Sequence, residues 1–146
     1  DYSTLTDAEI SERVAVRIFG YEFRTHSPDW SVWWCRSIED QSRDGRGWYR
    51  EPGASQWICQ ACYGPPMDPA SSWSDAGRVL ERMRELGWQF VLTIGATTGR
   101  PDCECFATFM HPNNAAQEWD EHQGIATTAP RAICEAAFKA LDAQEG

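Results

Sequence analysis

Long apolar runs are missing from this sequence, and so is any segment that would direct it out of the cell. No stretch of about 18 apolar residues occurs, so the sequence predicts no membrane-spanning helix. The chain does not open on a basic segment followed by an apolar one, so no signal peptide is expected. Both absences favour a soluble protein of the cytoplasm.

Positive charge is also scarce. The chain has 13 Lys and Arg residues against 22 Asp and Glu residues, a net charge of −9, and Lys139 is its single lysine. This sign disfavours broad contact with nucleic acid or with an anionic membrane. A small anionic ligand stays possible, because a local group of arginines can override the global charge.

Recognisable catalytic motifs are absent as well. The three histidines, His26, His111 and His122, show neither HxH nor HExxH spacing. The sequence contains no GxSxG elbow, no P-loop and no GxGxxG. We therefore expect a binding protein and not an enzyme.

The 146 residues predict a single domain, 1–146, which contains three helices. Thr6 and Glu9 form a capping box that starts a helix at 7–19, and Gly20 stands where such a helix ends. Ser74 is the expected N-cap of a second helix, 75–86. The last helix lies within TAPRAICEAAFKAL, with Pro130 in its first turn.

Two alternating runs, 88–94 and 103–109, are joined by Gly-rich residues and predict an antiparallel hairpin. Trp73 and Trp88 flank the second helix and are expected in the core. The polar stretch 111–126 is expected to be a loop, with at most a short strand before Thr127. The predicted fold is α+β, with three helices packed around a small antiparallel sheet as an α-β-α sandwich.

Residues 21–71 form an irregular insert, rich in Trp and Cys, within this domain. They carry five prolines and no sustained helical or strand period, although 32–36, 47–51 and 56–60 favour short strands. A structureless segment of this length is unusual in a compact domain. It needs its own small sheet, a metal or a ligand to order it.

A zinc site is the first chemical possibility in the insert. Cys59 and Cys62 have the spacing at which two thiolates face one metal, and Gly64 follows as in a zinc knuckle. Cys35 is the third candidate ligand, and His26, Cys103 or Cys105 could be the fourth. The alternatives are buried, reduced cysteines that pack as small apolar groups, or a redox pair that lacks the usual βαβ context.

Aromatic rings interleaved with guanidinium groups are the second possibility. Aromatic faces stack on bases and arginines grip phosphates, so this mixture suits a nucleotide-like ligand. The alternative is a mini-core of tryptophans kept soluble by the arginines. The candidate ligand-binding residues are Trp33, Trp34, Trp48, Trp57, Arg36, Arg46 and Arg50.

Three phrases resemble the phage ABA sandwich domain family: LTDAEISERVAVRIFGYEF, SWSDAGRVLERMRELGWQFVLTI and TAPRAICEAAFKAL. Together they cover roughly half of the chain. The resemblance implies helices around a small antiparallel sheet and a bacteriophage origin, and thus a location in the host cytoplasm. It brings no catalytic motif, and residues 21–71 match the family poorly.

Two functions are expected from these observations. The first is a non-enzymatic phage accessory protein that binds a small host molecule, such as a nucleotide immune signal, to counter host defence. It could work as a homo-oligomer, since sequestering proteins often place pockets between subunits. The second is a protein–protein interaction module that inhibits a host or phage protein through the Trp-rich insert.

Overall fold

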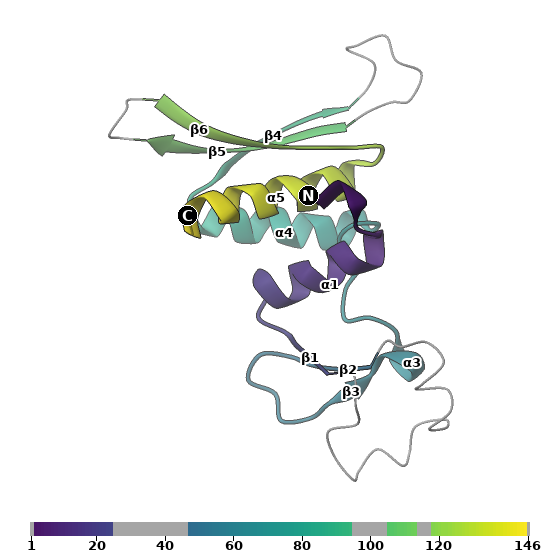
Figure 1. Cartoon of the computed structure of the whole chain (residues 1–146). Helices are drawn as coiled ribbons and strands as arrows, with labels where there is room; N and C mark the ends of the chain where they lie inside the picture. Colours follow the sequence, from purple (N-terminus) through teal and green to yellow (C-terminus); the bar gives the residue numbers. More distant parts are fainter. Residues whose placement is uncertain (1, 25–46, 95–104, 114–117, 146) are drawn as a thin grey trace. The chain divides into compact units, whose positions relative to one another are not determined.

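A computed structural model describes residues 2–24, 47–94, 105–113 and 118–145, and it confirms the α+β class (Figure 1). The chain divides into two compact units. One comprises Asp1–Val14 together with Asp68–Gly146, and the other comprises Ala15–Met67.

Helix α1 (Asp7–Arg17) starts as its sequence predicts. The backbone N–H of Thr6 donates to Glu9 Oε2 over 3.0 Å, and that of Glu9 donates to Thr6 Oγ1 over 3.2 Å. This reciprocal pair is a complete capping box. A short 3-10 helix, η1 (Tyr2–Thr4), precedes it, and Tyr2 stacks on the ring of Phe138 at 4.8 Å.

Helix α4 (Trp73–Glu85) starts earlier than predicted, because Ser72 and not Ser74 is its N-cap. The hydroxyl of Ser72 accepts a hydrogen bond from the backbone of Asp75 over 3.3 Å. The shift places Trp73 in the first helical turn with 58% of its surface exposed, so its predicted core position is wrong. Trp88, which follows the C-terminal end of the helix, is 4% exposed, so its predicted core position is confirmed.

The larger sheet has the strand order β4-β5-β6, with both pairs antiparallel. Strands β4 (Gln89–Ile94) and β5 (Cys105–Asn113) confirm the predicted hairpin. The predicted loop at 111–126 is wrong, because β5 continues to Asn113 and β6 (Glu118–Ala126) pairs with it over nine positions. The polar side chains of β6 are compatible with a strand since most of them are exposed while the backbone pairs with β5.

Helix α5 (Ala129–Glu145) packs on this sheet at Gly124. A Cβ atom at position 124 would overlap the carbonyl oxygen of Ala132 and lie 2.6 Å from the nitrogen of Ala136. Gly124 and the small residues of α5 therefore let the helix backbone approach the strand closely.

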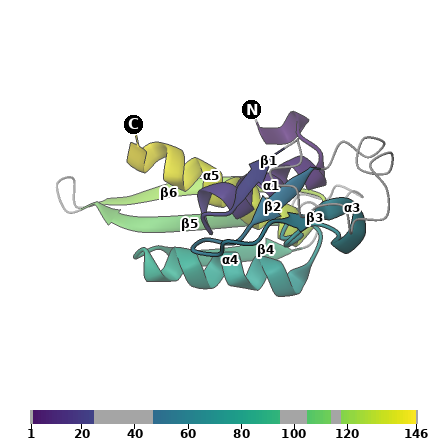
Figure 2. The same cartoon turned by 90° about the horizontal axis from the view of Figure 1, so that it is seen from below.

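Helices α4 and α5 lie on the same side of the β4-β5-β6 sheet (Figure 1). Seen from below, α5 runs beside β6 and α4 runs beside β4 (Figure 2). Within the described part of this unit, α4 and α5 thus cover one face of the sheet, and the predicted α-β-α sandwich is not confirmed. The largest fully buried side chains of this unit are Phe109, Phe138, Ile10, Met83, Ile133, Val14 and Val79.

The other unit contains a sheet of its own, with the order β1-β2-β3 and antiparallel pairing. Its strands are β1 (Glu22–Arg24), β2 (Trp48–Arg50) and β3 (Ile58–Cys59), followed by the short helix α3 (Gln60–Tyr63). Strands β2 and β3 lie in two of the predicted stretches, while β1 was not expected. The third predicted stretch, 32–36, lies outside the described residues.

Candidate functional site

The central strand of the small sheet is covered on both faces. Trp48 and Tyr49 are neighbours, so they point to opposite faces, yet they are only 2% and 8% exposed. The ring of Tyr49 lies 6.2 Å from the rings of both Tyr21 and Phe23. Burial raises the pKa of Tyr49, and electrostatic interactions with Tyr21 and Glu51 raise it further. These residues form the core of this unit.

Trp48 was predicted to stack on a ligand, but it belongs to this core. Its register partner Cys59 is 1% exposed, so the two side chains pack on one face of the sheet. Trp48 therefore has no exposed ring face to offer a ligand, and the mini-core interpretation fits this residue.

A cation–π cluster lies near Trp48 on the same face. The guanidinium carbon of Arg50 lies 4.6 Å from the ring centroid of Trp57, and that of Arg24 lies 4.7 Å from the same centroid. The register explains this gathering, because Tyr49 pairs with Ile58 and the next positions outward are Arg50 and Trp57. Two cationic groups thus share one partly exposed indole ring.

Glu22 completes this cluster. It pairs with Arg50 across β1 and β2, and its Oε2 lies 2.7 Å from Arg50 Nη2. The two side chains are 56% and 29% exposed, respectively, so solvent screens the ion pair. We call Glu22, Arg24, Arg50 and Trp57 the guanidinium–indole cluster.

The structure thus brings together two of the predicted ligand-binding residues, Trp57 and Arg50. The remaining candidates, Trp33, Trp34, Arg36 and Arg46, lie outside the described residues. Sequence reasoning missed Arg24 and Glu22. The signal was present in the alternation of Tyr21 and Phe23 with these two polar residues, directly after a helix-ending glycine.

The cysteines leave the zinc prediction open. Cys59 is a buried, free cysteine at the end of β3, and it stands at the N-cap of α3. Cys35, His26 and Cys103 lie outside the described residues, as does the environment of the Cys62 side chain. Among the side chains that are described, no group of three or more His, Cys, Asp or Glu is arranged to hold a metal.

Two histidines of the larger unit pack against Trp88. Its ring meets His111 edge-on at 5.1 Å and His122 edge-on at 5.6 Å. Within the described part of the chain, Trp88 Nε1 and His122 Nε2 are buried without a hydrogen-bond partner. The ring contacts assign both histidines to packing between the sheet and the end of α4.

Cys134 is buried in α5, where burial raises the pKa of its thiol to about 12, with a smaller contribution from the charge of Glu135. A thiol with this pKa stays protonated at neutral pH and is a poor nucleophile. Cys134 therefore belongs to the packed core of the larger unit.

No family model, no curated protein and no solved structure matches this chain. The resemblance to the phage ABA sandwich domain family therefore stays a prediction that rests on three phrases of the sequence. None of the helices in the described ranges is both long enough and apolar enough to cross a membrane.

Proposed function

We propose that this protein binds a small anionic, nucleotide-like ligand and that the guanidinium–indole cluster is part of its binding site. The observation that carries the proposal is the placement of two guanidinium groups, from Arg24 and Arg50, within 4.7 Å of the Trp57 ring centroid. Guanidinium groups bind phosphates through paired hydrogen bonds, and indole rings stack on bases.

The local charge supports an anion of limited size. The cluster combines two positive charges and one negative charge, within a chain whose net charge is −9. A small phosphate-bearing molecule needs only this local positive charge. A long polyanion would also meet the acidic remainder of the protein, which repels it.

The ion pair between Glu22 and Arg50 leaves room for such a ligand. Exposed ion pairs contribute only about 0–1 kcal/mol to stability. With exposed fractions of 56% and 29%, the pair belongs to this class. A phosphate group can therefore take the place of the Glu22 carboxylate on Arg50 at little cost.

The biological role that follows is sequestration without catalysis. If the chain is phage-encoded, as its resemblance implies, binding a nucleotide signal of the host's immune response would lower the free concentration of that signal. This role needs a sufficient affinity and no reacting group. It matches a sequence without a recognisable catalytic motif.

The test is thermal unfolding of the full chain with inorganic phosphate, mononucleotides and cyclic dinucleotides. A ligand that binds only the folded state at 100 times its dissociation constant adds about 2.7 kcal/mol of stability. We expect a rise in melting temperature with at least one nucleotide. Arg24→Ala and Arg50→Ala should each remove most of the rise, while the control Arg82→Ala, on the surface of α4, should keep it.

Trp57→Ala separates ligand stacking from folding. Its indole is partly exposed, so this variant should stay folded and lose nucleotide binding, whereas Trp48→Ala should destabilise the unit whether or not ligand is present. If a nucleotide binds the Arg24, Arg50 and Trp57 variants as well as it binds the parent, the proposed site is wrong.

A protein partner is the alternative function. Tyr63, at the end of α3, has 66% of its surface exposed, and exposed aromatic side chains are enriched at protein interfaces. In that case no nucleotide would change the melting temperature. Capture of a defined host or phage protein, lost on Tyr63→Ala, would then favour inhibition through the Trp-rich insert.

A further inference from the structure

The outer face of the β4-β5-β6 sheet is the side that points away from α4 and α5 (Figure 1). The registers bring its side chains into rows, because Thr93, Phe106 and Ile125 are paired neighbours, as are Val91, Thr108 and Gln123. We define the outer face by its eleven outward positions: Gln89, Val91, Thr93, Phe106, Thr108, Met110, Pro112, Trp119, Glu121, Gln123 and Ile125.

Large apolar side chains are exposed on this outer face. Val91 is 48% exposed, Trp119 is 49% exposed and Ile125 is 45% exposed. Phe106 and Met110 lie between them on β5 and are partly exposed. Large apolar side chains exposed on a sheet that has helices on its opposite side are typical of an interaction surface.

The scarcity of charged side chains on the outer face favours one kind of partner. Of the eleven outward positions, only Glu121 carries a charge, although the chain as a whole has a net charge of −9. Two copies of so acidic a chain repel each other least when they meet through a surface almost free of charge. We propose that the outer face packs against the outer face of a second copy and forms a symmetric dimer.

Pairing between the faces is favoured over pairing between the strand edges. The single lysine, Lys139, donates a hydrogen bond to the backbone carbonyl oxygen of Gln123 over 2.8 Å, which occupies an acceptor on the terminal strand β6. Lysine at a sheet edge commonly blocks the addition of another strand. The exposed Asp120 and Glu121 would also approach their own copies if two β6 edges paired.

A face-to-face dimer has a defined geometry. Two sheets pack about 10 Å apart through their side chains, with strand directions within about 30° of each other. Trp119 is the largest exposed ring on the face, and tryptophan dominates the binding energy of many interfaces. This dimer involves only the unit that carries the larger sheet, and it does not depend on the proposed nucleotide site.

Sedimentation velocity of the full chain over a wide concentration range tests the proposal. We expect a monomer–dimer equilibrium that strengthens with added salt, because salt screens the repulsion between the acidic chains. Val91→Lys and Ile125→Lys should each raise the dimer dissociation constant by about tenfold or more. The matched control is Leu86→Lys, at the end of α4, where the parent side chain is 40% exposed.

Several results would overturn the dimer. One is a monomer at every concentration, and a second is a dimer that Leu86→Lys disrupts as strongly as Val91→Lys does. A third is a dimer that weakens as salt is added, since ion pairs would then hold it. If Val91→Lys lowers the melting temperature of a monomeric parent, the chain covers this face itself, and the proposal is equally wrong.

Discussion

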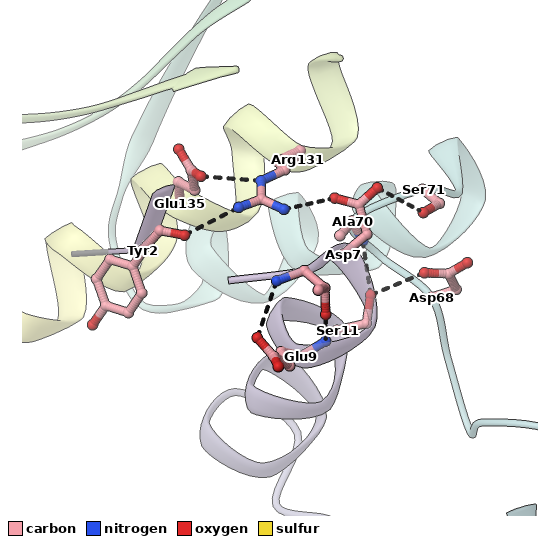
Figure 3. Close-up of polar contacts among 10 residues, drawn as sticks. Tyr2, Asp7, Glu9, Ser11, Asp68, Ala70, Ser71, Arg131 and Glu135 are labelled. Carbon is pink, nitrogen blue, oxygen red and sulfur yellow. Dashed lines mark hydrogen bonds and ion pairs between the residues drawn. The ribbon is translucent and has the colours of Figure 1, made fainter. Parts of the chain in front are cut away.

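An ion pair between Arg131 of α5 and Asp7 at the start of α1 joins two segments of the larger unit, with 2.8 Å between Arg131 Nη1 and Asp7 Oδ1 (Figure 3). The same guanidinium group donates to the carbonyl oxygen of Tyr2 and to Glu135 Oε1. Burial lowers the pKa of Arg131, but the hydrogen bonds to Asp7 and Glu135 outweigh burial and raise it. One side chain on α5 therefore holds both η1 and the start of α1.

Arg131→Ala should lower the free energy of unfolding by about 3 kcal/mol, the usual cost of removing one partner of a buried pair. The reason is that Glu135, with 6% of its side chain exposed, would lose its cation. Asp7→Asn should cost less, about 1 kcal/mol, because Asp7 is about half exposed. Urea unfolding followed by far-UV circular dichroism measures both changes.

The control is Arg82→Ala. Its ion pair with Glu85 has exposed fractions of 45% and 60%, and its loss should change stability by less than about 0.5 kcal/mol. An equal loss of stability in the Arg82 and Arg131 variants would show that the contacts of Arg131 stabilise the protein no more than an exposed ion pair does.

Gly124→Ala should destabilise the larger unit by about 3 kcal/mol, near the upper end for overpacked sites. The new methyl group would collide with the backbone of Ala132 and Ala136 on α5, and backbone atoms cannot rotate away as side chains do. Thermal unfolding measures the effect.

Gly77→Ala is the matched substitution. It lies inside α4 with no atom within 4 Å of a new Cβ, so alanine should stabilise by about 0.5–1 kcal/mol through its helix propensity. If both alanine variants were tolerated alike, the close packing of α5 on β6 would be excluded.

Because of Cys134, we expect the folded protein to lose stability at alkaline pH. The pKa of its thiol rises from a usual value near 9 to about 12 on folding, so the unfolded chain releases this proton first. Stability from the protonated thiol is fully present below pH 9 and is lost progressively as the pH rises toward 12. Burial also raises the pKa of Tyr49, which adds a loss of the same sign at higher pH.

Denaturant midpoints measured between pH 8 and pH 11 test this titration. Cys134→Ala should lower stability at pH 8, because it removes a buried group, yet flatten the decline above pH 9. A variant whose decline parallels that of the parent would assign the alkaline effect to other groups.

The zinc site predicted from the sequence can be tested directly. If Cys59 and Cys62 bind a metal with Cys35, native mass spectrometry of the protein should show an excess of one zinc per chain. Cys59→Ser should lose the metal and loosen the 15–67 unit, since structural zinc contributes directly to folding. A metal-free mass for the folded parent would leave Cys59 as a buried, reduced thiol.

Local features of the sequence determined most of the elements. Some features depend only on a few neighbouring residues, so the sequence predicts them directly. They are the capping box of Thr6 and Glu9, the end of α4 at Gly87 and the alternating run of β4. The same locality explains the confirmed α+β class. Even so, Ser72 and Ser74 are equally good caps by composition, and the structure uses the earlier one.

Features that depend on distant partners were decided only by the tertiary structure. Strand β6 is polar and lacks a clear apolar alternation, so it exists because β5 supplies its hydrogen bonds. Trp48 and Trp57 look alike in the sequence, but register buries one beside Cys59 and leaves the other beside Arg24 and Arg50. The sequence alone determined which residue types were available for binding, whereas strand pairing between distant segments decided which of them meet.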